Sequence, residues 1–312
     1  MTFNDAITVF YACDDRYMPY LSVSLLSLAK NSNKDRKYNV VILHSGLDDR
    51  NIKSIKGLET ENISVSFANL SDSLRRIASR LSLRDYYSLS IYYRIFIPEM
   101  FQSTDKAVYL DADTVVLGDI AELFETKLDG ALVAAAPDKV VASEEVFRNY
   151  ATDGVGVPFE KYFNSGVLVM DLEKMRDFGL QSVFTELLEE YGFETICPDQ
   201  DYLNVICRDR VRYLGTEWNR MSVDRSPCGE LKLIHYNMFF KPWLYPNVQY
   251  EEYFWEYAKH SPFFEEILDA RRRFGEESVK SDEEAGKALR KAAQAIIDSE
   301  KNFKNSLEGV FA

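Results

Sequence analysis

Residues 106–116 read Lys-Ala-Val-Tyr-Leu-Asp-Ala-Asp-Thr-Val-Val, an apolar run that ends in two acidic residues and is followed by a second apolar run. The β-branched and aromatic residues predict a buried strand that ends at the acidic pair. Successive side chains of an extended chain point to opposite faces, so Asp111 and Asp113 face the same side and can hold one cation. Asp-x-Asp also marks simple turns, so the pair alone leaves both interpretations open.

The segments before this stretch alternate between strand and helix. Residues 7–13 are almost continuously apolar, as expected of a central parallel strand buried on both faces. Pro19 begins a helical pattern, residues 38–43 form a second apolar run, and Asp48 is placed to cap the helix that precedes a third run at 63–67. This order predicts an open α/β sheet, in which ligands collect beyond the carboxyl ends of the strands. A Gly-x-Gly-x-x-Gly loop is absent, so a dinucleotide-type phosphate loop is not supported.

Length and composition limit the class of protein. The chain has 312 residues, 46% of them apolar, which is enough for a sizeable core. A net charge of −13 argues against nucleic acid as a partner, because phosphate binding needs clustered Lys and Arg. The four cysteines are scattered, which fits a reducing compartment, and no segment has the pattern of a signal peptide or a membrane-spanning helix. We therefore expect a cytoplasmic protein.

The last part of the chain has a helical composition. We expect a catalytic domain at 1–248 and a helical extension at 249–312. Apolar residues recur at nearly helical spacing from residue 281 onward, with both charge signs between them. This pattern favours packing on the domain or on a partner helix over binding to a membrane. A second copy of the chain and the inner face of the membrane are the two alternative partners for this extension.

Further polar residues lie at the ends of other predicted elements. Arg94 lies in a Tyr-rich segment with a helical pattern, residues 71–101, that includes Tyr86 and Tyr87, and the sequence Asn-Ser-Gly at 164–166 precedes an apolar strand. Asp199 is a natural N-cap for a helix, and His235 follows the last predicted strand. Each has a structural alternative, because most arginines form surface ion pairs, helix starts favour Asp, and a lone histidine is more often structural than a ligand.

Seven short motifs occur along the chain in this order: 10–17 (FYACDDRY), 93–94 (YR), 109–113 (YLDAD), 163–167 (FNSGV), 199–201 (DQD), 235–236 (HY) and 241–243 (KPW). In order and spacing, they resemble glycosyltransferase family 8, which includes bacterial lipopolysaccharide galactosyl- and glucosyltransferases and glycogenin. The resemblance implies a GT-A fold with a mixed, mostly parallel sheet flanked by helices. It also implies a UDP-sugar donor, a divalent cation (Mn²⁺, or Mg²⁺) and transfer with retention of anomeric configuration.

The resemblance also implies roles for individual residues. The metal ligands would be Asp111, Asp113 and His235. The nucleotide-sugar contacts would be Ala12 and Asp14 (uracil and ribose), Arg16, Arg94, Ala112, Ser165 and Lys241 (diphosphate). The sugar and reaction centre would be lined by Gln200, Asp199, Asn164 and Asp138. Two positions depart from the lipooligosaccharide galactosyltransferases, which have Asn at the position of Arg16 and Gly at that of Met238.

The chemistry of these residue types agrees with sugar transfer. Breaking the bond between a sugar and a diphosphate leaves negative charge on the leaving group, which a cation and a lysine neutralise. Carboxylates with one imidazole suit Mn²⁺ better than Ca²⁺. Retention could proceed on one face of the sugar or through a covalent intermediate on Asp201 or Asp138. The same-face route is favoured because Gln200 is a poor nucleophile.

The sequence therefore predicts a metal-dependent, retaining glycosyltransferase that moves glucose or galactose from UDP to a glycan, lipid-linked or protein-linked acceptor. A nucleotidyltransferase is one alternative, but a Gly-rich, basic triphosphate loop is not found near the first strand. A sugar-nucleotide-binding protein without transfer activity is the other. The complete set of Asp111, Asp113, His235 and Lys241 argues against such a decayed site.

Overall fold

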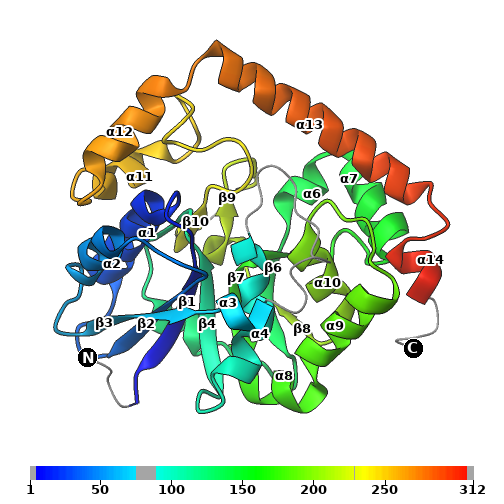
Figure 1. Cartoon of the computed structure of the whole chain (residues 1–312), viewed down its shortest axis with the longest axis horizontal. Helices are drawn as coiled ribbons and strands as arrows, with labels where there is room; N and C mark the ends of the chain where they lie inside the picture. The colour runs from blue at the N-terminus through cyan, green and yellow to red at the C-terminus, as the bar shows by residue number, and fades with distance from the viewer. Residues whose placement is uncertain (1–4, 75–88, 228, 308–312) are drawn as a thin grey trace.

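A computed structural model describes residues 5–74, 89–227 and 229–307. Within this part of the chain, a seven-stranded central sheet has the order β3-β2-β1-β4-β7-β6-β8 (Figure 1). Its strands are β1 (Ile7–Ala12), β2 (Tyr38–His44), β3 (Ile63–Asn69), β4 (Lys106–Asp111), β6 (Val133–Pro137), β7 (Phe163–Asp171) and β8 (Val211–Tyr213). Tyr86, Tyr87 and Cys228 lie outside the described residues.

The direction of β7 brings distant segments to one edge of the sheet. Strands β1 to β4 pair in parallel, whereas β7 runs antiparallel to both β4 and β6. Leu110 near the end of β4 is paired with Val167 in the middle of β7, and Pro137 at the end of β6 is paired with Phe163 at the start of β7. The ends of β4 and β6 therefore lie against the first half of β7. The sheet is mixed and mostly parallel, as predicted.

A small second sheet places His235 beside the acidic pair. It has the order β5-β10-β9, formed by β5 (Thr114–Val116), β10 (Leu233–His235) and β9 (Arg220–Met221). Because β10 runs antiparallel to β5, His235 is paired with Thr114, the residue after Asp113. This register, rather than closeness in sequence, brings the imidazole to the carboxylates.

Both faces of the central sheet are covered, so β1 is buried on both sides as predicted. Val9 and Tyr11 belong to one hydrophobic core and Phe10 to the other. In Figure 1, α1 and α2 lie beside the β1–β3 half, and α8 to α10 lie beside the β6–β8 half. The helices before residue 215 are α1 (Met18–Asn31), α2 (Asp49–Lys56), α3 (Ser71–Leu74), η2 (Leu89–Tyr92), α4 (Tyr93–Met100), α5 (Ile120–Phe124), α6 (Lys139–Ser143), α7 (Glu145–Asn149), η3 (Tyr150–Val155), α8 (Leu172–Phe178), α9 (Leu180–Glu190) and α10 (Pro198–Ile206).

Helix starts confirm one predicted cap and contradict another. Asp48 caps α2 by accepting a hydrogen bond from the Arg50 backbone at 2.7 Å, as predicted. Asp199 is not an N-cap, because α10 begins at Pro198, two residues earlier than such a cap requires, and its N-cap residue is Cys197. Asp199 therefore lies in the first turn, and its carboxylate contacts other side chains.

The C-terminal helices pack on the rest of the molecule, as the spacing of their apolar residues predicts. After the short η4 (Thr216–Trp218), they are α11 (Glu251–Ala258), α12 (Phe264–Arg273), α13 (Glu276–Ile297) and α14 (Phe303–Leu307). In Figure 1, α13 runs from α12 past α7 to α14. Leu289 and Ile296 of α13 are buried in the same core as Phe303 and Leu307 of α14. Among the described helices, none combines the length and apolar character needed to cross a bilayer.

Candidate functional site

A cavity of about 240 Å³ lies where the ends of β1 and β4 meet the start of β7. All the residues to which the family resemblance gives a role line this cavity: Ala12, Asp14, Arg16, Arg94, Asp111, Ala112, Asp113, Asp138, Asn164, Ser165, Asp199, Gln200, His235 and Lys241. They come from segments spread between residues 12 and 241, which the two sheets bring together. The structure thus assembles the predicted residues at one place.

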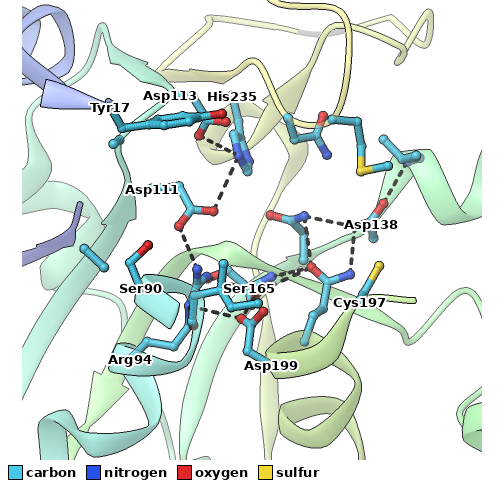
Figure 2. A pocket seen from close by; sticks show the side chains of 18 of the residues that line it. Tyr17, Ser90, Arg94, Asp111, Asp113, Asp138, Ser165, Cys197, Asp199 and His235 are labelled. Carbon is cyan, nitrogen blue, oxygen red and sulfur yellow. Dashed lines mark hydrogen bonds and ion pairs between the residues drawn. The ribbon is translucent and has the colours of Figure 1, made fainter. Parts of the chain in front are cut away.

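Asp111, Asp113 and His235 form a compact cluster (Figure 2). One candidate ligand atom from each side chain lies within 4.8 Å of the others. The Nε2 atom of His235 is 3.2 Å from Asp113 Oδ1 and 3.7 Å from Asp111 Oδ2. Two carboxylates and one imidazole are a suitable ligand set for Mn²⁺ or Mg²⁺.

Two further observations show that the cluster fits a cation. Asp113 Oδ1 is buried and has no hydrogen-bond partner of suitable geometry, although His235 Nε2 lies nearby. A buried oxygen without a donor is costly unless something else, such as a metal ion, contacts it. A Cβ atom added to Gly166 would lie 2.3 Å from His235 Cε1 and 2.5 Å from Asp111 Oδ2, so the backbone of β7 forms a floor directly under the cluster.

Arg94 joins the cluster to Asp199. Arg94 is 3% exposed, so it does not form a surface ion pair, which was the structural alternative given for it. Its Nη2 atom donates to Asp111 Oδ1 at 2.8 Å, its Nε atom lies 3.1 Å from Asp199 Oδ2, and its Nη1 atom donates to Ser165. Burial opposes the charge of Arg94, but the Asp111 and Asp199 carboxylates raise its pKa above the usual value. The same burial raises the pKa of Asp199, with Arg94 opposing the shift.

Lys241 is, after Arg94, the second buried basic side chain that contacts the cluster. Its ammonium group donates to Asp113 Oδ2 and to the Tyr236 carbonyl. Burial opposes the ionisation of Asp113, but the Lys241 ammonium group outweighs it and holds the pKa of Asp113 below its usual range. Burial also opposes the charge of Lys241, whose pKa is nevertheless raised by Asp113. Asp113 therefore carries its charge across the physiological pH range.

A group of amides and one carboxylate forms the opposite wall. Asp138 Oδ2 accepts hydrogen bonds from Asn164 Nδ2 at 2.9 Å and from Gln200 Nε2 at 3.0 Å. Asp138 Oδ1 caps α6 by accepting from the backbone of Val140 and Val141. Gln200 Oε1 accepts from the Ser165 backbone at 2.9 Å. Both oxygens of Asp138 are thus held by donors.

Asp201, a candidate nucleophile on sequence grounds, does not face the cavity. It is fully buried and is not among the residues that line the cavity. Its carboxylate accepts hydrogen bonds from the hydroxyl groups of Tyr150 at 2.6 Å and Tyr162 at 2.5 Å, and from the Cys197 backbone. These contacts hold the Asp201 carboxylate in the core behind α10, away from the cavity, and so disfavour it as the nucleophile of a covalent route.

Arg16 and Met238, the two positions that depart from the family pattern, differ in what the structure shows: a side-chain ion pair at Arg16 and a backbone conformation at Met238. Arg16 pairs with Asp14 at 3.0 Å and its side chain is 78% exposed, so it folds over Asp14 at the rim. Met238 has a φ of +59°, a left-handed backbone conformation that favours glycine. The loop before Lys241 therefore has a glycine-like backbone without a glycine.

Three residues were missed by the sequence reasoning. Tyr17 lines the same cavity and is drawn next to Asp113 in Figure 2. The Tyr109 hydroxyl donates to Asp111 Oδ1 at 3.0 Å, and Asn219 Oδ1 lies 3.0 Å from His235 Nδ1. Tyr17 and Tyr109 lie within motifs that carry the family resemblance, which was the available signal. No local sequence pattern singles out Asn219.

Two known proteins have sequences similar to that of this chain. The lipopolysaccharide 1,2-glucosyltransferase of Escherichia coli K12 is 28% identical over 272 residues, which cover 79% of this chain and 77% of that protein. A Haemophilus influenzae protein is 26% identical over 226 residues, 72% of this chain and 66% of its own length. The chain therefore spans slightly less than two thirds of that relative.

Solved structures extend the comparison. The galactosyltransferase LgtC, solved with donor and acceptor sugar analogs, has a TM-score of 0.70 at 25% identity and covers 82% of this chain and 96% of its own. The bifunctional glycosyltransferase WbbM has a TM-score of 0.74 at 24% identity and covers 87% of this chain, which spans only 53% of WbbM. These likenesses confirm the predicted GT-A fold. The model of Glycosyl transferase family 8 matches residues 8–246, most of the chain, and this chain therefore belongs to that family.

Proposed function

We propose that this chain is a metal-dependent, retaining glycosyltransferase that moves glucose or galactose from a UDP-sugar to a glycan, lipid-linked or protein-linked acceptor. One observation carries the proposal. The buried Asp113 Oδ1 atom lacks a hydrogen-bond partner at the point where Asp111, His235 and Lys241 converge. A site of this kind suits a divalent cation next to an anionic leaving group.

Asp111, Asp113 and His235 would hold Mn²⁺ or Mg²⁺. The bound ion would supply positive charge to the diphosphate as the bond to the sugar breaks. Lys241 would donate from its ammonium group to the same diphosphate, which its position on Asp113 supports. The left-handed backbone at Met238 supports a close approach of that loop to the phosphates.

The remaining residues would bind the two ends of the donor. Ala12, Asp14 and Arg16 would contact the uridine, and Ala112 and Ser165 would complete the nucleotide-sugar contacts, since they line the same cavity. Arg94 and Asp138 would hold the hexose. Asn164, Asp199 and Gln200 would line the reaction centre with them.

The arrangement favours transfer on one face of the sugar. Asp201 is held away from the cavity, and both oxygens of Asp138 accept hydrogen bonds from fixed donors. A carboxylate engaged in this way is a weakened nucleophile. We therefore infer that the departing phosphate takes the acceptor proton and that Gln200 stays uncharged and unmodified.

Separate observations support the proposed acceptor class and the proposed cellular location. The E. coli relative is named as a lipopolysaccharide glucosyltransferase, which supports a glycan or lipid-linked acceptor here. The free thiols of Cys13, Cys197 and Cys207 support a reducing, cytoplasmic location. We assign catalysis to residues 1–248. The helices of 249–312 would form the contact with a second copy or with the inner face of the membrane.

The test is release of UDP from UDP-glucose and from UDP-galactose with Mn²⁺, first without an acceptor and then with glycan and lipid-linked acceptors. We expect slow hydrolysis of one donor without acceptor, and no release by Asp113→Asn. Pyrophosphate release from a nucleoside triphosphate would instead indicate a nucleotidyltransferase. Calorimetric UDP binding without turnover of any UDP-sugar would indicate a binding protein, and would contradict the proposal.

A further inference from the structure

Asn219 lies behind the cluster of Asp111, Asp113 and His235 and links it to Asn164 in the opposite wall of the cavity. It is 1% exposed and occupies the position between η4 and β9. Its Oδ1 atom lies 3.0 Å from His235 Nδ1, on the side of the ring away from the carboxylates. Its Nδ2 atom donates to Asn164 Oδ1 at 3.0 Å. Asn219 therefore contacts a residue from each of the two parts of the site.

Two backbone groups of β7 decide which way these amides point. The N–H of Gly166 donates to Asn164 Oδ1 at 3.0 Å, and the N–H of Ser165 donates to Gln200 Oε1 at 2.9 Å. A backbone N–H can only donate, so the atoms facing it must be the amide oxygens. The orientation of Asn164 thus follows from the backbone, and Asn219 must present its NH₂ group to Asn164 Oδ1. The oxygen of Asn219 then faces His235.

This orientation determines the tautomer of the neutral imidazole. The carbonyl oxygen of Asn219 can only accept a hydrogen bond, so His235 must carry a hydrogen on Nδ1. The neutral ring then has its lone pair on Nε2, the atom that faces Asp111 and Asp113. A histidine that binds a metal through one nitrogen needs the other nitrogen held in this way.

We propose that Asn219 is a positioning residue that holds His235 as the Nδ1–H tautomer, with Nε2 presented to the cation. This inference rests on the metal site of the proposed function. The same chain of hydrogen bonds continues from Asn164 Nδ2 to Asp138 Oδ2 and to Gln200 Oε1. Asn219 therefore ties the orientation of a metal ligand to the residues assigned to the hexose, and both are anchored on the start of β7.

The first experiment reads the tautomer in the unmodified protein. The chain has three histidines, so ¹⁵N-histidine labelling gives few signals, and His235→Gln identifies those of residue 235. At about pH 8.5, where a free imidazole is neutral, we expect a hydrogen on Nδ1 of His235. Addition of Mg²⁺, which is diamagnetic, should shift Nε2 and leave Nδ1 protonated. A ring with a hydrogen on Nε2 and a bare Nδ1 would overturn the proposal.

The second experiment measures binding of Mn²⁺ alone, without nucleotide, by the electron paramagnetic resonance signal of the free ion. Asn219→Leu keeps the approximate volume but removes the acceptor, and should raise the Kd for Mn²⁺ by about 10- to 100-fold. Asn219→Asp restores an acceptor beside Nδ1 and should recover most of that loss. Thermal denaturation reports separately whether each variant folds.

The matched control is Asn62→Leu. Asn62 is also buried and hydrogen-bonded, to Ser32 and the Asn33 carbonyl, but it lies outside the cavity. This variant should lower the melting temperature without changing the Kd for Mn²⁺. If Asp113→Asn weakens Mn²⁺ binding and Asn219→Leu does not, the positioning role proposed for Asn219 is contradicted. If neither substitution changes Mn²⁺ binding, the metal site of the proposed function is contradicted.

Discussion

A Cβ atom on Gly166 would lie 2.3 Å from Cε1 of His235, so the backbone of β7 and the imidazole are in direct contact. Gly166→Ala should therefore displace His235 and the neighbouring Asp111 carboxylate. Because metal affinity depends on ligand geometry, we expect the Kd for Mn²⁺ to rise at least about tenfold. Gly166 does not have a positive φ, so the effect would be steric. Gly229→Ala, where a Cβ atom meets no atom within 4 Å, is the control and should leave Mn²⁺ binding unchanged.

Asp113→Asn tests the ligand assignment directly. The amide removes one negative charge from the cluster and leaves Lys241 without its anionic partner. We expect the rate of UDP release to fall by about 100-fold or more, since charge stabilisation of the leaving group is a large part of such a barrier. The far-ultraviolet circular dichroism spectrum should stay unchanged. Activity with the same dependence on Mn²⁺ as the native chain would show that Asp113 is not a ligand.

The left-handed backbone at Met238 predicts an inverted order of stability for two substitutions. Ala is usually more stabilising than Gly, but at positive φ the Cβ atom is strained, so Met238→Gly should be more stable than Met238→Ala by about 1 kcal/mol. Urea denaturation measures the difference. At Phe240, which is exposed and lacks a positive φ, the usual order should hold. Equal stabilities of the two Met238 variants would contradict the assigned conformation.

Asp201 should make the stability of the fold depend on pH. Burial raises its pKa to about 7, although the Tyr150 and Tyr162 hydroxyl groups favour its charge. In the unfolded chain the carboxyl titrates near about 3.9. Between these values the folded protein binds the additional proton, so the free energy of unfolding should fall as the pH rises, by on the order of 4 kcal/mol. Urea denaturation at about pH 4.5 and about pH 7.5 should show this loss in the native chain but not in Asp201→Asn.

The same variant tests the stereochemical proposal. Because Asp201 faces the tyrosine hydroxyls and not the cavity, Asp201→Asn should keep kcat within about threefold of the native value, once the protein is confirmed to be folded. Asp138→Asn, which alters a residue of the cavity wall, should lower kcat strongly. A fall of about 100-fold or more in a folded Asp201→Asn protein would indicate that Asp201 acts in the reaction after all.

Local sequence patterns predicted those features that depend on neighbouring residues. The sequence predicted Asp111 and Asp113 on one side at the end of a strand, and both do lie beside His235. Asp111 is the last residue of β4, whereas Asp113 lies in the turn before β5, so the turn interpretation of this pair also holds. The same kind of reasoning failed at Asp199, because α10 begins at Pro198 and the carboxylate contacts Arg94 and Ser165 instead of capping the helix. The sequence also left Asp201 open as a candidate nucleophile, because its partners Tyr150 and Tyr162, which hold it away from the cavity, are distant in sequence.

The sequence by itself determined the α/β class, the family and the residue types that converge on the site, because these depend on periodicity and on the order of motifs. Only the tertiary structure decided that β7 runs antiparallel to β4, that Gly166 contacts His235 and that Asn219 orients this ring. Strand direction and contacts between distant segments depend on how whole elements pack. A single stretch of sequence does not encode which partner its backbone and side chains will meet.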